Sequence, residues 1–144
     1  MKKGIDYIGV TASYLAHDGN GRYVMTKRGQ NCRDEQGTWD FGGGGVDLGD
    51  SVEETIVKEV KEELDADVLE MEFLGYRDLF REHEGEKTHW VSFQFLVRVD
   101  PVQVKNGEPH KFDDVQWFTL DNLPSPLHST AIPMLEKFKD KLPK

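Results

Sequence analysis

The segment from Gly42 to Leu64 constrains the fold more than any other part of the chain. It opens with four consecutive glycines, continues through an acidic turn, VDLGD, and ends in a helix signal. Glycine supplies a flexible backbone, and the free N–H groups and dipole of a helix amino terminus favour anions. The segment therefore predicts a glycine loop leading into a helix whose first turn is suited to a negatively charged group.

The helix signal itself begins at Ser51. The sequence SVEE offers a capping box from Ser51 to Glu54, in which the serine side chain accepts a bond from the third helical residue. Apolar residues then recur at helical spacing, which predicts one buried face made of Ile56, Val57, Val60 and Leu64.

Three carboxylates border this apolar face, at Glu59, Glu62 and Glu63. Like charges four residues apart on a helix repel by roughly a few tenths of a kcal/mol. The negative charge of these carboxylates therefore calls for a positive charge nearby. A hard divalent cation such as Mg²⁺ favours carboxylate oxygens and is commonly completed by substrate phosphates. A solvated acidic helix is the alternative when this segment is considered alone.

Other charges on the same helix have opposite partners four residues away. We expect Glu54 to pair with Lys58, and Lys61 with Asp65, on the outer side of the helix.

The remaining pattern alternates between strand signals and one more helix. The final helix is expected from a cap at Ser129 to about Leu142, with Pro133 in or near its first turn. The charged segment REHEGEK is expected as an exposed hairpin loop or a longer excursion. Strands divided by two helices give a mixed α/β architecture, and the expected strands are 5–15, 22–28, 71–80, 88–99 and 115–119.

Composition limits the class of protein. A chain of 144 residues with 37% hydrophobic side chains suits one domain, expected to cover 1–144. The net charge of −9 argues against stable nucleic-acid binding and against attraction to anionic membranes. No apolar run approaches the roughly 20 residues that span a bilayer, and no signal peptide is evident, so we expect a cytoplasmic protein. The single cysteine, Cys32, is expected to be an inert packing or loop residue.

The glycine loop and acidic helix together resemble the box of the Nudix (MutT-like) hydrolases. That box runs from a glycine, through a glutamate and an Arg-Glu pair, to a Glu-Glu pair, a glycine and an aliphatic residue. It falls here on residues 44–66 with its spacing intact, and the outright matches are Gly44, Glu59, Val60, Glu62 and Glu63.

Three positions depart from the family pattern: Asp50 replaces a glutamate, Lys58 an arginine and Asp65 a glycine. The resemblance implies that Asp50 and Lys58 form a supporting ion pair with shorter reach and without the bidentate fork. Asp65 is tolerable because aspartate is among the residues that visit the left-handed conformation.

The resemblance implies an α/β/α sandwich with a mixed β-sheet, in which the box forms loop, helix and loop. It also implies Mg²⁺, with Mn²⁺ as a second choice, held by Glu59, Glu62 and Glu63, which would be the metal ligands and catalytic residues. Glu59 is the first choice as general base or close metal ligand. A base from the REHEGEK loop, at Glu82, Glu84 or Glu86, is the alternative.

The resemblance implies hydrolysis of a nucleoside diphosphate linked to another group, first of all a nucleoside triphosphate cleaved to monophosphate and pyrophosphate. A hydrolase of ADP-ribose or a nucleotide sugar is the second enzyme reading. A noncatalytic nucleotide-sensing domain is the alternative of another class. The partner is then a small nucleotide, and homodimers are common in the family.

Substrate-binding residues are expected at three places. Arg28 ends a strand. It is expected either to bind a phosphate of the substrate or to be a surface arginine. Trp39 and Phe41 are aromatic residues that stack on a base or pack in the core. Gly44 opens the box and belongs to its phosphate loop. The five histidines show no metal-ligand spacing and are expected to be surface or structural.

Overall fold

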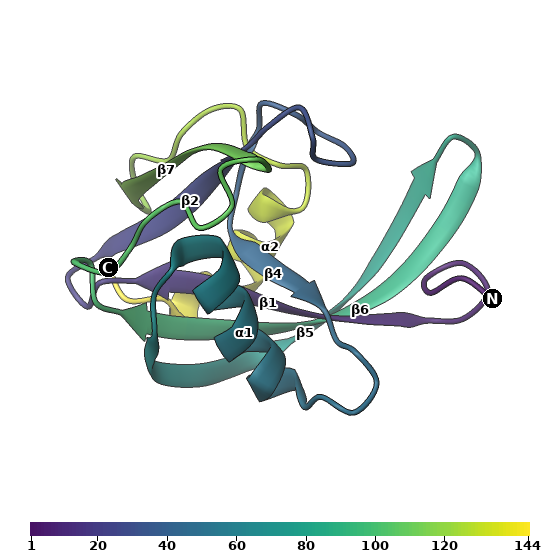
Figure 1. The fold of residues 1–144 in the computed structure, drawn as a ribbon, viewed down its shortest axis with the longest axis horizontal. Helices are drawn as coiled ribbons and strands as arrows, with labels where there is room; N and C mark the ends of the chain where they lie inside the picture. The colour runs from purple at the N-terminus through teal and green to yellow at the C-terminus, as the bar shows by residue number, and fades with distance from the viewer.

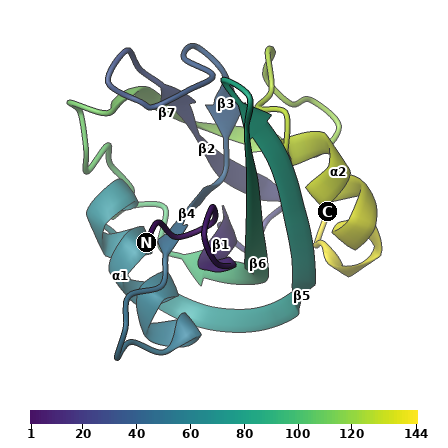
Figure 2. The ribbon, with the colours of Figure 1, turned by 90° about the vertical axis from the view of Figure 1, so that its right-hand side faces the viewer.

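A computed structural model describes all residues, 1–144, as one mixed sheet with a helix against each face (Figures 1 and 2). The strand order is β3-β2-β1-β6-β5, with β4 paired to β1 and β7 paired to β2. β1 and β6 run parallel and the other pairs run antiparallel. The strands are β1 (Gly9–His17), β2 (Arg22–Arg28), β3 (Trp39–Asp40), β4 (Gly42–Gly45), β5 (Val68–His83), β6 (Glu86–Val99) and β7 (Phe112–Thr119).

The helices are α1 (Val52–Leu64) and α2 (Ala131–Phe138), and a short 3₁₀ turn, η1 (Lys139–Lys141), follows α2. Successive side chains of a strand point to opposite faces, and β1 shows this clearly. Ala12 and Tyr14 belong to a buried cluster with Ile56 and Val60 of α1, whereas Leu15 belongs to a second cluster with Met134 of α2. The expected mixed α/β sandwich is confirmed.

Two of the expected elements match closely. β2 covers the predicted residues 22–28, and α1 starts directly after Ser51. The predicted first strand begins too early, because Gly4 N–H donates to the Tyr7 carbonyl at 2.7 Å and closes a turn before β1. The last strand, β7, starts three residues before the predicted Val115.

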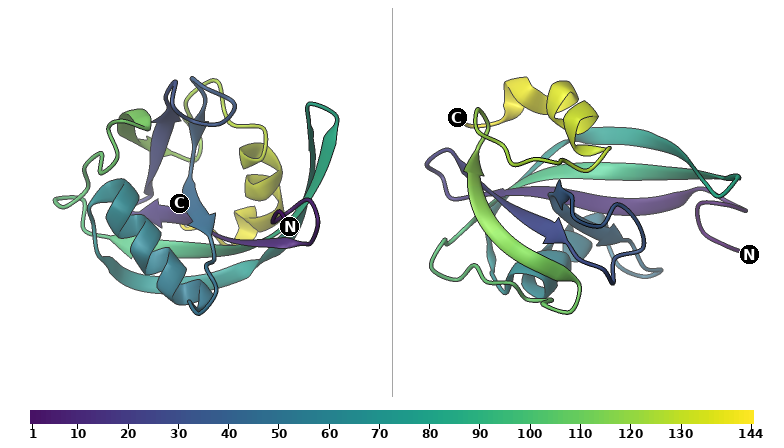
Figure 3. Two further views of the ribbon diagram at one scale, coloured as in Figure 1. Left: turned by 45° about the vertical axis from the view of Figure 1, so that its right-hand side comes forward. Right: turned by 90° about the horizontal axis from the view of Figure 1, so that it is seen from above.

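The REHEGEK segment is mostly strand, and only its centre turns. β5 and β6 extend on both sides to a tight turn at Glu84 and Gly85, both with positive φ. The resulting hairpin projects from the body of the molecule, away from α1 (Figures 1 and 3).

The expected cap of the last helix is wrong. Thr130 stands at the cap position, and the Ser129 hydroxyl instead donates to Glu35 Oε2 at 2.8 Å. Pro133 lies in the first turn of α2, where a missing N–H costs little. No helix in the structure has both the length and the apolar character needed to cross a membrane.

Candidate active site

Both ends of α1 are capped, the first by the Ser51 side chain and the last by the Asp65 backbone. Ser51 Oγ accepts from the Glu54 amide at 3.0 Å, as the capping box predicts. Asp65 adopts the left-handed conformation, with φ 54°, and its N–H donates to the Lys61 carbonyl at 3.0 Å. Asp65 thus does at this position what a glycine would do, and the departure from the family box leaves the helix end intact.

Glu63 is the buried member of the acidic group, with 3% of its surface exposed. Its Oε1 accepts two hydrogen bonds, from the Tyr14 hydroxyl at 2.9 Å and from the Gly43 amide at 3.1 Å. Its second oxygen, Oε2, forms no hydrogen bond with the protein. The glycine strand β4 and β1 therefore fix this carboxylate and leave one oxygen free.

Glu59 lies against the glycine strand one turn earlier on α1. A Cβ atom at Gly44 would meet the Glu59 carboxyl carbon at 2.4 Å, which is closer than real side chains approach. Gly44 is required for this contact, because any side chain would displace the carboxylate. Glu62 is exposed on the outer side of the same group.

The charges of this group are incompletely compensated. Burial, and then the charge of Glu59, raise the pKa of Glu63 to about 8. Burial, and then the charge of Glu62, raise the pKa of Glu59 to about 7. Neither carboxylate has an ion-pair partner. A crowded set of carboxylate oxygens with a free oxygen on Glu63 fits the requirements of a hard divalent cation.

Two charged residues near this group went unassigned in the sequence. Lys111 lowers the pKa of both Glu59 and Glu63 through its charge, and Glu108 raises that of Glu59. They belong to the loop before β7, which docks on the end of α1 because Gly107 N–H donates to the Glu63 carbonyl at 2.9 Å. Nothing in the spacing of the segment EPHKF, residues 108–112, places it beside the helix.

The supporting ion pair differs from the expectation. Lys58 Nζ lies 3.5 Å from Asp47 Oδ2, and Asp50 forms no ion pair. Glu54 also does not pair with Lys58, whereas Lys61 and Asp65 pair at 3.5 Å as predicted. The shorter Asp50 side chain does not reach the lysine, and Asp47, three residues earlier in the same loop, takes its place.

A cavity of about 230 Å³ opens beside Glu63. Its walls come from the glycine strand, the end of β2 and the first turn of α2, and its floor is the central sheet. The polar and charged side chains that line it are Thr11, Ser13, Thr26, Arg28, Asp40, Glu63, Arg77, Ser92, Gln94, Lys111 and Thr130.

The expected binding residues are not all in this cavity. Arg28 lines it and donates through Nη2 to Asp34 Oδ1 at 2.9 Å. Phe41 lines it and is buried, whereas Trp39 does not line it. Trp39 packs edge-on against Phe118, with ring centroids 5.2 Å apart, which gives this tryptophan a packing role.

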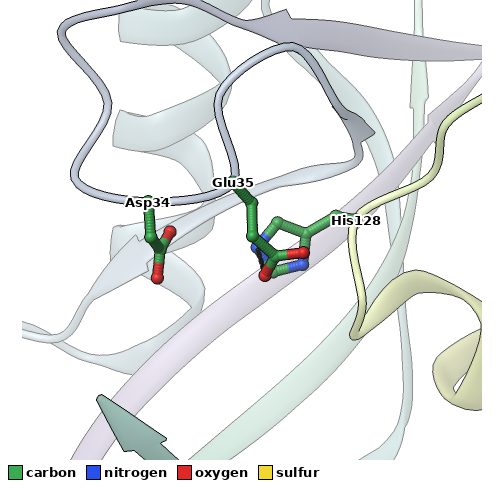
Figure 4. A group of neighbouring side chains, drawn as sticks. All are labelled: Asp34, Glu35 and His128. Carbon is green, nitrogen blue, oxygen red and sulfur yellow. Dashed lines mark ion pairs between the residues drawn. The ribbon is translucent and has the colours of Figure 1, made fainter. Parts of the chain in front are cut away.

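A second acidic group, Asp34, Glu35 and His128, brings its ligand atoms within 4.8 Å of one another (Figure 4). Its oxygens are already used: Glu35 Oε2 lies 2.8 Å from Arg81 Nη2 and 2.9 Å from His128 Nε2. Ser129 also donates to Glu35 through its amide at 2.8 Å. The group is an ion-pair clasp between the loop after β2 and the start of α2.

A family model described as "NUDIX domain" matches residues 8–138. Among curated relatives, the chain is 32% identical over 84 residues to an NAD-capped RNA hydrolase, NudC, of Pseudomonas aeruginosa, covering 56% of this chain and 27% of that protein. It is 26% identical over 101 residues to an RNA pyrophosphohydrolase of Gluconacetobacter diazotrophicus, covering 61% of this chain and 60% of that protein. The chain thus spans less than two thirds of either relative.

Solved structures are similar over nearly the whole chain. A MutT NUDIX hydrolase from Burkholderia pseudomallei is 29% identical, with a TM-score of 0.80, covering 91% of this chain and 98% of that one. The NUDIX domain of Shewanella oneidensis NrtR, solved in complex with ADP ribose, is 17% identical, with a TM-score of 0.68, covering 99% and 91%. The second likeness shows the fold alone.

Proposed function

Because the chain belongs to the NUDIX domain family, we propose that it is a divalent-metal-dependent pyrophosphohydrolase. Its substrate would be a nucleoside diphosphate linked to another group, with a nucleoside triphosphate, cleaved to monophosphate and pyrophosphate, as the first choice. One observation carries this proposal. The fixed, buried carboxylate of Glu63 lies in the wall of a cavity, and it belongs to a group of carboxylates whose negative charges are incompletely compensated.

Glu59, Glu62 and Glu63 would hold Mg²⁺, or Mn²⁺ in its place. A bound ion would supply neutralisation of the diphosphate and a lower pKa for a coordinated water. The free Oε2 of Glu63 is the oxygen available for this purpose, since Oε1 is committed to Tyr14 and Gly43.

Glu59 is our choice for the general base. In the reaction, the oxygen of water bonds to phosphorus, the bridging P–O bond breaks, and pyrophosphate leaves. The proton of the attacking water passes to a carboxylate oxygen of Glu59. The hairpin glutamates are poorer candidates, since Glu84 lies in the turn that projects away from α1 (Figure 3).

Lys111 and Arg28 would bind the phosphates. Lys111 lies close enough to Glu59 and Glu63 to lower the pKa of both, and it lines the cavity. Arg28 lines another part of the same cavity. Gly44 would contribute to the site because it has no side chain, which lets the backbone of β4 lie against the Glu59 carboxylate.

The test is release of phosphate or pyrophosphate from a panel of substrates, with Mg²⁺ or with EDTA. The panel contains nucleoside triphosphates, ADP-ribose, nucleotide sugars, dinucleoside polyphosphates, and short RNAs with a 5′-triphosphate or an NAD cap. The variants are Glu59→Gln, Glu62→Gln and Glu63→Gln, each of which removes one charge. Glu53→Gln, an exposed change in the first turn of the same helix, is the matched control.

We expect turnover that requires Mg²⁺, is retained in Glu53→Gln and falls by about a hundredfold or more in the three variants. The best substrate in the panel identifies the leaving group. Nucleotide binding without turnover of any substrate would contradict hydrolysis and would support a sensing domain.

A further inference from the structure

The two cations proposed to bind phosphates come from segments far apart in the sequence that meet in one place. Arg28 is the last residue of β2, and Lys111 stands directly before β7. β2 and β7 pair antiparallel, with Arg28 opposite Phe112, so these strand ends lie side by side (Figure 1). The loop between β2 and β3, residues 29–38, leaves the sheet at this point and contacts the backbone beside Lys111.

The first four residues of this β2–β3 loop hold the backbone at Lys111. Gly29 N–H donates to the Lys111 carbonyl at 2.9 Å, and the Cys32 thiol donates to the same oxygen at 3.3 Å. Asn31 Nδ2 donates to the carbonyl of the preceding residue, His110, at 2.7 Å. Three donors from one short segment therefore hold two adjacent carbonyls of the chain that carries the cation.

The contact at Gly29 leaves no room for a side chain. A Cβ atom there would meet the Lys111 carbonyl oxygen at 2.8 Å and Asp113 Oδ1 at 2.7 Å, both closer than real Cβ atoms approach. Gly29 does not have a positive φ, so an alanine at this position would introduce the collision without backbone strain. The backbone at Lys111 would have to move in response.

The other side of Lys111 is tied to the acidic group. Gly107, in the same loop as Lys111, donates its N–H to the Glu63 carbonyl at 2.9 Å. Lys111 Nζ lies 5.2 Å from the centroid of the buried Phe112 ring, lines the cavity and forms no ion pair. A lysine has a flexible four-carbon stem, so the reach of its ammonium group depends on where the backbone is held.

The β2–β3 loop is itself anchored by residues that do not line this cavity. Gln36 Nε2 donates to the Cys32 carbonyl at 2.8 Å within the loop. Glu35 accepts from the Ser129 amide at 2.8 Å and from Arg81 Nη2 at 2.8 Å. These bonds form without a ligand, so the loop can hold Lys111 in place before a substrate binds, which lowers the entropy lost on binding.

We propose that Gly29, Asn31 and Cys32 are positioning residues for Lys111, and that the β2–β3 loop thereby sets the cation that receives the diphosphate. This inference rests on the proposed function, which assigns the phosphates to Lys111 and Arg28. None of the three positioning residues lines the cavity, so each acts through the backbone of Lys111 and does not touch the substrate.

Arg28 provides an internal comparison. Its guanidinium is oriented by a different part of the loop, because Nη2 donates to Asp34 Oδ1 at 2.9 Å and Nε donates to the Asp34 carbonyl at 3.0 Å. Loss of the Asn31 contact should therefore affect the contribution of Lys111 and leave that of Arg28 unchanged.

The test is calorimetric binding of imidodiphosphate, a diphosphate that resists hydrolysis, in the presence of Mg²⁺. One double-mutant cycle combines Asn31→Ala with Lys111→Met, and a second combines Asn31→Ala with Arg28→Met. Gly29→Ala, alone and with Lys111→Met, tests the same contact by displacing the carbonyl. Asn31→Gln keeps the amide donor, and Asn122→Ala, at an exposed asparagine outside the loop, is the matched control.

We expect Lys111→Met to weaken binding about tenfold or more, and Asn31→Ala and Gly29→Ala to weaken it about threefold to tenfold. In the Lys111→Met background, Asn31→Ala and Gly29→Ala should cause no further loss, because the group they position is gone. With Arg28→Met, the loss from Asn31→Ala should persist in full. Asn31→Gln should retain more affinity than Asn31→Ala, and Asn122→Ala should match the wild type.

Undiminished losses in the Lys111→Met background would overturn the inference, since the loop would then act by another route. Unchanged affinity in Asn31→Ala and Gly29→Ala, unchanged affinity in Lys111→Met, or no binding by the wild type would overturn it too. Hydrolysis is scored separately on the substrate panel. Coupling of Asn31 to Lys111 without turnover of any substrate removes only the hydrolase proposal, and turnover without this coupling removes only the present inference.

Discussion

Tyr14 donates its hydroxyl to Glu63 Oε1 at 2.9 Å, and this bond joins the sheet to the acidic face of α1. Tyr14 is 2% exposed and packs in the core cluster beneath the helix. Burial, and then the negative charge of Glu63, raise the pKa of Tyr14 well above its usual value, so the hydroxyl remains a donor at any working pH. The core thereby fixes the orientation of a site carboxylate.

Replacing Tyr14 by phenylalanine should reduce activity while keeping the fold. The ring still fills the core, but Glu63 loses one of its two donors and its side chain gains freedom. A hydrogen bond to a charged group contributes about 1.5–3 kcal/mol, so we expect kcat/KM to fall by about tenfold to a hundredfold. The Tyr14 hydrogen bond lowers the pKa of Glu63, so its loss should raise that pKa and move the acidic limb of the pH profile to higher pH.

Tyr23→Phe is the matched control for this experiment. Tyr23 is also a buried tyrosine, and its hydroxyl donates to the Pro143 carbonyl at 2.6 Å, near the carboxyl terminus. That variant should lose some thermal stability and keep its kcat/KM and pH profile. Equal activity losses in both variants would mean that Tyr14 acts through general stability.

The metal-free protein should become less stable as the pH rises. The pKa of Glu63 is about 8 in the folded chain and near 4.5 in the unfolded chain, so the folded state holds more protons between those values. The contribution of Glu63 to the free energy of unfolding is therefore present below about pH 4.5 and is lost progressively toward about pH 8. Thermal unfolding in EDTA from pH 5 to 8 measures this slope.

Glu63→Gln isolates the contribution, because other titrating groups are common to both proteins. The variant should show a shallower fall of Tm between pH 5 and 8 in EDTA. Mg²⁺ should raise the Tm of the wild type more at pH 8 than at pH 6, since binding requires the ionised carboxylate. Parallel slopes for the two proteins would show that Glu63 is ionised without a metal.

Local patterns in the sequence predicted the helix that carries the site. The cap at Ser51 and the position of the acidic stripe depend on residues within a few positions of one another, whereas the left-handed Asp65 is expected from the glycine of the family box. Hydrophobic periodicity likewise predicted β2 and the α/β class. Such features are determined by neighbours in the chain, and a single sequence contains them.

Long-range contacts were not predictable in the same way. Lys111 comes to the acidic group through a loop that docks on α1 more than forty residues after Glu63. Ser129 pairs with Glu35, 94 residues away, and so fails as a helix cap. The sequence offers several equivalent charges for each such contact, and only the folded chain selects among them.

Gly44→Ala should impair the site more than the fold. The new Cβ would meet the Glu59 carboxylate, which is the end of a flexible side chain and moves aside. A displacement of about 1 Å costs roughly a hundredfold in rate when it affects a reacting group, so kcat should fall by that order. Gly45→Ala is the control, because a Cβ there meets nothing within 4 Å. Similar kcat values for the two variants would contradict the contact.

The partner of Lys58 can be measured by two double-mutant cycles on thermal stability. One cycle combines Lys58→Ala with Asp47→Ala, and the other combines it with Asp50→Ala. We expect a small coupling in the first cycle that weakens with salt, because both groups are solvent-exposed, and no coupling in the second. Coupling only to Asp50 would restore the ion pair implied by the family box.

The clasp at Glu35 should stabilise the protein without any metal. Burial alone would raise the pKa of Glu35, but hydrogen bonds from Ser129 outweigh it and lower that pKa, so the carboxylate is ionised. Glu35→Gln keeps the shape but loses the charge that faces Arg81 and His128, and should lower the free energy of unfolding by about 1–3 kcal/mol. Urea unfolding with and without EDTA measures the change. An equal loss in both conditions supports an ion-pair clasp, whereas a loss confined to the samples without EDTA, to which Zn²⁺ is added, would identify a metal site. Glu82→Gln, an exposed glutamate at the end of β5, is the control and should change stability little.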